Sequence, residues 1–169
     1  GWRVPRLVRL FISRLRLKTC DEESFPDSKP FCYAVCTAGD SIGKTIDTLN
    51  KCLQTNHQLQ EMGISQPDSA YSLIMPESYV GLPFMDVDPP EKEKRKKEKA
   101  AQQLKAISED LREQKTGISH LTEGPLPWFF THIVGGFFEH VLITDKRFHV
   151  VEERCVKCGI CANVCPVGD

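Results

Sequence analysis

The stretch Phe-Cys-Tyr-Ala-Val-Cys-Thr at residues 31–37 decides the fold class. It is an almost unbroken apolar run of strand length, which is typical of a strand buried on both faces of a parallel sheet. A glycine-containing loop follows at 38–43, and apolar residues then recur at helical spacing over 45–53. A strand, a tight loop and a helix in this order predict an α/β unit.

The segments on either side continue this pattern. Residues 5–17 alternate apolar and arginine-rich faces, which predicts an amphipathic helix packed on the domain rather than one lying on a membrane. Residues 71–75 predict a second strand, 76–90 a proline-rich loop, and 91–113 a long charged helix whose first half is exposed. The apolar stripe of that helix is expected at Leu104, Ile107 and Leu111.

Three regions are expected from these patterns: 1–117 for the α/β part, 118–149 for a packing linker, and 150–169 for a cysteine-rich segment. The linker is rich in aromatic residues between 128 and 143. Histidine and glutamate side chains interrupt that stretch, so we expect it to pack rather than to anchor the chain in a membrane.

Composition narrows the class of protein. The chain has 169 residues, 40% of them hydrophobic, and a net charge of −1, which fits one domain with a small appendage. A nucleic-acid binder would be strongly basic, and no apolar run is long enough to span a membrane. Residue 1 is glycine rather than methionine, the helical pattern starts within the first five residues, and Asp169 follows the last cysteine by four residues, as expected for an internal fragment of a longer chain.

The densest chemical signal is the cysteine run Cys155-Val-Lys-Cys158-Gly-Ile-Cys161-Ala-Asn-Val-Cys165-Pro. It fits the C-x₂-C-x₂-C-x₃-C-P run that binds iron–sulfur clusters in bacterial ferredoxins. Structural zinc sites use two separated Cys-x-x-Cys pairs, and a disulfide framework does not need this spacing, so both are weaker alternatives. The run predicts a [4Fe–4S] cluster. In two-cluster ferredoxins the fourth cysteine serves the other cluster, so the partner of Cys165 stays open.

A second motif competes for the function. Residues 38–45, Ala-Gly-Asp-Ser-Ile-Gly-Lys-Thr, differ from a phosphate-binding P-loop only in having alanine at the first glycine position. Lys44 would reach the phosphates and Thr45 would hold magnesium. A P-loop nucleotide-binding protein with an iron–sulfur module is therefore the alternative function.

The remaining cysteines carry no ligand pattern. Cys20, Cys32, Cys36 and Cys52 are expected to be buried or half-buried thiols, and the spacing places Cys32 and Cys36 on one face of their strand. No arrangement typical of a catalytic triad or of a zinc protease occurs in the sequence. Whether the protein is an electron carrier or a component of a flavin/iron–sulfur oxidoreductase stays open.

Four segments together resemble the flavodoxin–ferredoxin fusion family, also called EFR-type ferredoxins, of anaerobic microbes. Gly1-Trp-Arg-Val-Pro5 and the following helix resemble the region after that family's third strand. Tyr33 to Gly39 with Gly43 resembles its fourth strand and flavin-side loop, and Leu73 to Tyr79 resembles its fifth strand. Lys146 to Cys155 resembles the start of its cluster domain.

This resemblance implies the C-terminal part of a flavodoxin-like parallel sheet, followed by the start of a ferredoxin-like domain. The family's first three strands and its phosphate loop have no counterpart in these residues. The implied function is electron transfer between FMN, the cluster and a redox partner protein or flavoenzyme. A cytoplasmic location is expected separately, from reduced thiols and an oxygen-sensitive type of cluster. The flavin site would lie at the carboxyl ends of the strands. Its residues would be Trp2, Thr37, Ala38, Gly39, Asp40 and Gly43, and the P-loop likeness would then be coincidental.

Overall fold

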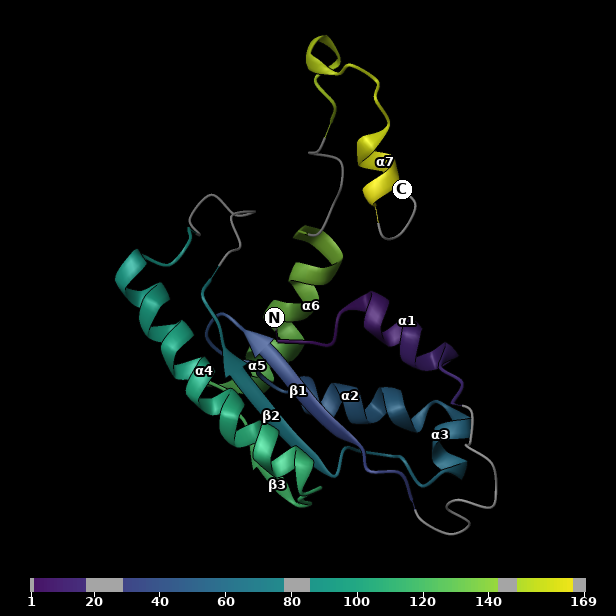
Figure 1. Ribbon diagram of the computed structural model, residues 1–169. Coiled ribbons are helices and arrows are strands. Elements are labelled where there is room, and N and C mark those ends of the chain that lie inside the picture. Colours follow the sequence, from purple (N-terminus) through teal and green to yellow (C-terminus); the bar gives the residue numbers. More distant parts are fainter. Residues whose placement is uncertain (1, 18–28, 78–85, 143–148, 166–169) are drawn as a thin grey trace.

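The computed structural model describes residues 2–17, 29–77, 86–142 and 149–165 (Figure 1). Its centre is a parallel three-stranded sheet in the order β1 (Tyr33–Ala38), β2 (Ser69–Ile74) and β3 (Ile118–His120). The α/β class expected from the sequence is therefore confirmed in its coarse form. Helices lie on both sides of this sheet, as a parallel sheet requires.

One side of the sheet is covered by α1 (Arg6–Arg14), α2 (Thr45–Gln54) and α3 (His57–Glu61). Their apolar side chains form a cluster with the residues that follow them. The cluster is built on Ile12, Leu53, Leu59 and Ile64, with Cys32 and Cys52 packed against it. Asn56 caps α3 by accepting a hydrogen bond from Leu59 N, and its amide donates to Ile12 O at 2.7 Å. This buried asparagine ties α1 to α3.

The opposite side is covered by α4 (Pro90–Arg112). Ala100 and Ile107 of this helix pack on Tyr71 and Leu73 of β2, with Leu111 at the edge of the cluster. The first turns of α4 are mostly exposed, as the charged sequence predicts. Leu104 was expected in the apolar stripe, and the structure shows this to be wrong, because its side chain is 50% exposed.

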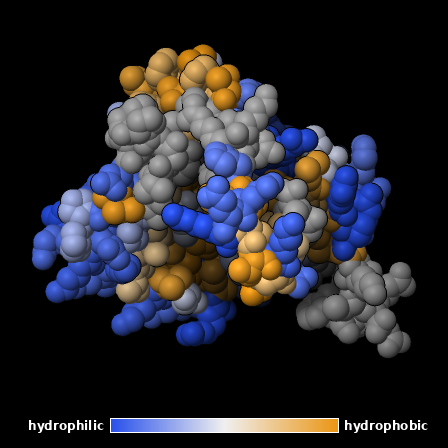
Figure 2. All heavy atoms as spheres, turned by 90° about the horizontal axis from the view of Figure 1, so that it is seen from above, coloured by the Kyte–Doolittle hydropathy of each residue, from blue (hydrophilic) through white to orange (hydrophobic). Residues whose placement is uncertain are grey.

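Residues 127–142 form one helical column that alternates between α and π hydrogen bonding. Its parts are α5 (Pro127–Phe129), η1 (Phe130–Val134), α6 (Gly135–Phe137) and η2 (Phe138–Leu142). Arg9 of α1 forms an ion pair with Glu139 that lowers the pKa of this carboxyl, and Arg3 lies 3.4 Å from it. Figure 2 shows hydrophobic side chains gathered at its upper edge, over this column. No helix in the described ranges is long and apolar enough to cross a membrane.

The burial of the strands corrects one expectation. β1 was expected to be buried on both faces, but Tyr33, Val35 and Thr37 are exposed and only the alternate residues turn inward. The strand that is buried on both faces is β2, which lies in the middle of the sheet with helices over both faces. The sequence did not reveal α3, the short β3 or α7 (Ile160–Val164). Parts of the 76–90 loop, together with Cys20, lie outside the described residues.

Candidate metal centre

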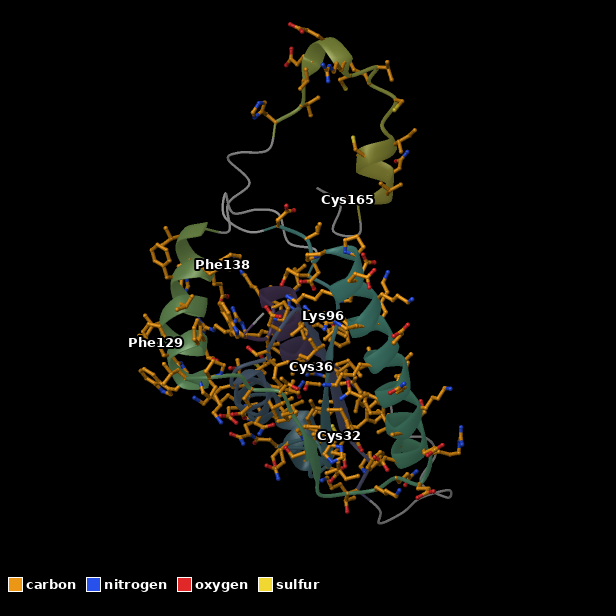
Figure 3. All side chains as sticks on the ribbon, turned by 90° about the vertical axis from the view of Figure 1, so that its left-hand side faces the viewer. Cys32, Cys36, Lys96, Phe129, Phe138 and Cys165 are labelled. Atoms are coloured by element: carbon orange, nitrogen blue, oxygen red, sulfur yellow. The ribbon has the colours of Figure 1, made fainter. Side chains whose placement is uncertain are left out.

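The cysteine segment extends away from the α/β body (Figures 1 and 3). A short 3₁₀ turn, η3 (Glu152–Arg154), precedes Cys155, and α7 carries Cys161 and ends at Val164, directly before Cys165. Lys157 and Gly159 both have positive φ, +54° and +72°, so the backbone reverses twice between the first and third cysteines. Such tight turns let thiols three residues apart face a common centre, and glycine adopts this conformation without strain.

None of the four cysteines of the run forms a disulfide. Cys155, Cys158 and Cys161 are exposed, and Cys165 is half-buried. Within the described ranges no three His, Cys, Asp or Glu side chains lie close enough together to hold a metal ion. The structure thus shows four cysteines outside disulfides, three of them exposed, on a segment with two sharp turns, while their assignment as ligands stays a prediction.

The cysteines of the α/β body have a different environment. Cys32 and Cys36 lie on the same face of β1 and its approach, and Figure 3 shows both inside the body, far from Cys165. Burial raises the pKa of Cys32, Cys36 and Cys52, and Asp68 adds to the effect at Cys32. A raised thiol pKa disfavours the thiolate that binds metals. All three are half-buried thiols, within the range expected from the sequence.

The P-loop-like segment is closed by other parts of the chain. The N–H groups of Ile42 and Lys44 donate to Thr122 O at 2.9 Å and to Thr131 Oγ1 at 2.8 Å. Lys44 Nζ lies 2.7 Å from Glu123 Oε2, a hydrogen bond that raises the lysine pKa. A P-loop binds phosphate through free N–H groups and a free lysine. In this structure both kinds of donor already have partners.

The residues predicted for a flavin lie around the same loop. Trp2 Nε1 donates to Ser41 Oγ at 3.1 Å, and the indole ring packs on Phe130 with centroids 5.0 Å apart. A Cβ on Gly43 would lie 2.5 Å from Thr131 Oγ1, so Trp2 and Thr131 cover this glycine. The structure therefore brings Trp2 and Gly43 together.

The other four flavin candidates lie at the end of β1. Thr37 is exposed and Ala38 is buried. Gly39 lies beneath the Glu77 side chain, and Gly39 O accepts a 2.6 Å hydrogen bond from Lys96 Nζ. The flavin assignment stays a prediction.

A buried ionic group joins the loops that follow β1 and β2. Asp88 is hydrogen-bonded to Lys92 at 2.7 Å, Lys96 at 2.6 Å and Glu77 N at 2.9 Å. These bonds hold the pKa of Asp88 well below its ordinary range. Lys96 also reaches Asp40 at 3.3 Å. Sequence reasoning missed this group, and no sequence signal marks Glu123 or Thr131 either, because their partners lie 79 and 87 positions away.

Comparison with known proteins bears on the cysteine segment alone. Residues 148–168 match the family described as the 4Fe-4S binding domain. That range contains all four cysteines of the run, which supports a ferredoxin-like iron–sulfur module. No curated protein and no solved structure matched the chain. The flavodoxin relationship thus stays a resemblance. The family match supports an iron–sulfur segment at residues 148–168, and the structure shows that an α/β body precedes it.

Proposed function

We propose that this protein transfers electrons through a [4Fe–4S] cluster bound by Cys155, Cys158 and Cys161, with Cys165 as the fourth ligand. The observation that carries the proposal is the complete ligand run inside the segment that matches the 4Fe-4S binding domain. When bound, such a cluster supplies reversible one-electron transfer. The described residues contribute four cysteines outside disulfides, two sharp turns, and a short helix that spaces Cys161 from Cys165.

The exposure of the segment favours a carrier role. Val156, Ile160 and Val164 lie beside the cysteines and are all exposed. Apolar side chains around a cluster limit water access and thereby tune its potential. An exposed cluster segment also permits close approach of a partner, as short-range electron transfer requires. The partner class we propose is a redox protein or flavoenzyme, in the cytoplasm.

The test is to measure iron and acid-labile sulfide per chain after anaerobic reconstitution, with zinc offered in parallel. We expect nearly equal iron and sulfide, approaching about four of each, as one cubane cluster requires. Cys158→Ser should lose most of both, whereas the control Cys36→Ser, which alters a thiol in the α/β body, should retain them. Zinc retained without sulfide would overturn the electron-transfer proposal.

A separate variant tests whether Cys165 is the fourth ligand of this cluster. Cys165→Ser should reduce the iron content if Cys165 closes the cluster of its own run. An unchanged iron and sulfide content in this variant would show that Cys165 serves elsewhere, as in two-cluster ferredoxins. Electron paramagnetic resonance of the dithionite-reduced protein would then show whether the remaining cluster is intact.

FMN is the finer part of the proposal and rests on the flavodoxin resemblance. Thr37 is an exposed candidate at the carboxyl end of β1, where ligands of parallel sheets bind. The measurement is a titration of FMN with the chain, followed by flavin fluorescence. Quenching that Thr37→Val weakens would support a flavin role, and unchanged fluorescence would remove FMN from the proposal while leaving the cluster.

A further inference from the structure

Lys157, inside the cysteine run, has a backbone conformation that favours glycine. Its φ is +54°, in the left-handed region, where the Cβ of an ordinary residue lies too close to the following carbonyl oxygen. Gly159, two residues later, has a φ of +72°, and a Cβ added there would meet no atom within 4 Å. The chain therefore makes one of its two reversals with glycine, without strain, and the other with a strained lysine.

The other non-glycine residues with positive φ lie at helix ends. In the described ranges these are Gln114 and Leu126. Gln114 follows the last residues of α4, where a left-handed residue commonly ends a helix, and its N–H donates to Leu111 O at 3.1 Å. Leu126 directly precedes α5. Lys157 has no such position, because it lies between two cysteines and before α7 begins. A strained residue kept where glycine would fit indicates that its side chain has a role.

The charge of the Lys157 side chain is not neutralised within the chain. The residue is exposed, and in the part of the chain that the structure describes it forms no ion pair or hydrogen bond. Other lysines differ: Lys44, Lys96 and Lys115 each pair with a carboxylate at 2.6 to 2.9 Å. Lys157 thus places an unpaired positive charge between the first two cysteines of the run.

A positive charge at this place would act on an iron–sulfur cluster through its field. Reduction adds one negative charge to the cluster, so a nearby cation stabilises the reduced form more than the oxidised form. Net charge around the cluster is one of the factors that set its potential. Glu152 and Glu153 of η3 have the opposite sign, but both precede the first cysteine, whereas Lys157 has a cysteine on either side.

We propose that Lys157 raises the reduction potential of the cluster, because its ammonium group stabilises the reduced form. This inference rests on the proposed function, in which Cys155 and Cys158 bind the cluster. One electron passes from the redox partner to the cluster, no proton moves, and no bond to Lys157 forms or breaks. Lys157 is a positioning residue and not a ligand: its backbone makes the turn between two ligands, and its charge acts from that turn.

The test is an optical redox titration of the reconstituted full chain with dithionite, at low salt. Lys157→Asn removes the charge and keeps a residue that tolerates positive φ. Its equilibrium constant for reduction should be about threefold smaller than that of wild type, as expected for one charge close to the cluster but exposed to water. Lys157→Arg keeps the charge and should restore the wild-type potential. Salt at about 1 M should reduce the difference, because it screens the charge.

Further variants separate the charge from the backbone and from the net charge of the protein. Lys157→Gly removes strain and charge together, so it should keep its iron and sulfide and show the same shift as Lys157→Asn. Lys157→Glu should about double that shift, to about tenfold, which is about 59 mV for a one-electron couple. Lys51→Glu makes the same change in net charge at an exposed lysine of α2, away from the cysteine segment, and should leave the potential unchanged (Figure 1).

Several results would overturn this inference. Equal potentials of wild type and Lys157→Asn at low salt would show that the charge has no effect. A shift in Lys157→Arg as large as in Lys157→Asn would assign the effect to side-chain shape, and an equal shift in Lys51→Glu and Lys157→Glu would assign it to net charge.

Metal analysis distinguishes this failure from failure of the proposed function. Loss of iron and sulfide from both Lys157→Asn and Lys157→Gly would show that Lys157 is needed to bind the cluster rather than to set its potential. Wild type without iron and sulfide would refute the proposed function, and this inference with it. Full iron and sulfide in every chain, with equal potentials, would refute this inference alone.

Discussion

Lys96 Nζ lies 2.6 Å from Asp88 Oδ2, and both side chains are largely buried, at 12% and 5% exposure. The same ammonium donates to Gly39 O, also at 2.6 Å, so one lysine of α4 holds the loop after β1 and the loop after β2. Lys92 takes the other oxygen of the Asp88 carboxylate at 2.7 Å. Two cations on successive turns of α4 thus fix the carboxyl ends of the two main strands.

The ionised Asp88 carboxylate should stabilise the folded protein, and this contribution should decline in acid. Because the folded pKa of Asp88 is lowered, its stabilisation is complete above its ordinary pKa, about 4, and declines as the pH falls through that range toward the folded pKa. Urea unfolding from pH 7 to 3 should show wild type losing its advantage over Asp88→Asn below about pH 4. Asp86→Asn, at an exposed aspartate nearby, is the control and should follow wild type. A gap between wild type and Asp88→Asn that is constant with pH would contradict this assignment.

The second core cluster should respond to truncation of Ile107 and not of Leu104. Ile107→Ala removes a buried side chain packed near Tyr71 and should lower the free energy of unfolding by about 2–5 kcal/mol. Leu104→Ala, three residues earlier and half exposed, should change it by no more than about 0.5 kcal/mol. Chemical denaturation of both variants measures this. Equal losses would mean that Leu104 is covered in solution.

Thr131 should stabilise the folded protein mainly through a single hydrogen bond. Thr131→Val keeps the shape of this fully buried side chain but removes the acceptor of Lys44 N. An unpaired buried N–H costs about 1–3 kcal/mol, which urea unfolding would detect. Thr55→Val removes a hydroxyl that is exposed and should cost less. Indistinguishable stabilities of the two variants would show that Thr131 does not secure the loop.

Gly43 should be harder to replace than Gly117, although both have positive φ. Alanine at Gly117, where φ is +76°, would meet no atom within 4 Å, so its cost is the backbone strain, roughly 1 kcal/mol. Alanine at Gly43, where φ is +53°, adds a contact of 2.5 Å with Thr131. The melting temperature of Gly43→Ala should therefore fall further. A larger fall for Gly117→Ala would mean that the loop relaxes around the new methyl group.

The alternative function, nucleotide binding by the P-loop-like segment at 38–45, can also be tested. Because Ile42 N, Lys44 N and Lys44 Nζ are bonded within the chain, millimolar Mg–ATP should not raise the melting temperature. Glu123→Gln weakens the Lys44 pairing and tests whether the lysine is merely masked. Stabilisation by Mg–ATP that is lost in Lys44→Ala would revive nucleotide binding.

The sequence by itself determined the α/β pattern, the positions of most main elements, and the cysteine run. Helical spacing over 45–53 and the ligand spacing from Cys155 to Cys165 are local properties, readable wherever the segment lies. The α2 and α4 bounds accordingly differ from the expected ones by one residue. The cysteine run also carries its chemistry independently of the body to which it is attached.

Only the tertiary structure decided which strand is central and what surrounds the loop after β1. An apolar run shows that a strand is suited to burial, but the neighbours of Val35 depend on sheet order, which places β2 and not β1 in the middle. The Lys44 side chain bonds to Glu123, and its backbone N–H bonds to Thr131, because the chain passes this loop again about 80 residues later. Periodicity within a segment contains no information about such distant partners, since they are selected by packing of the whole domain.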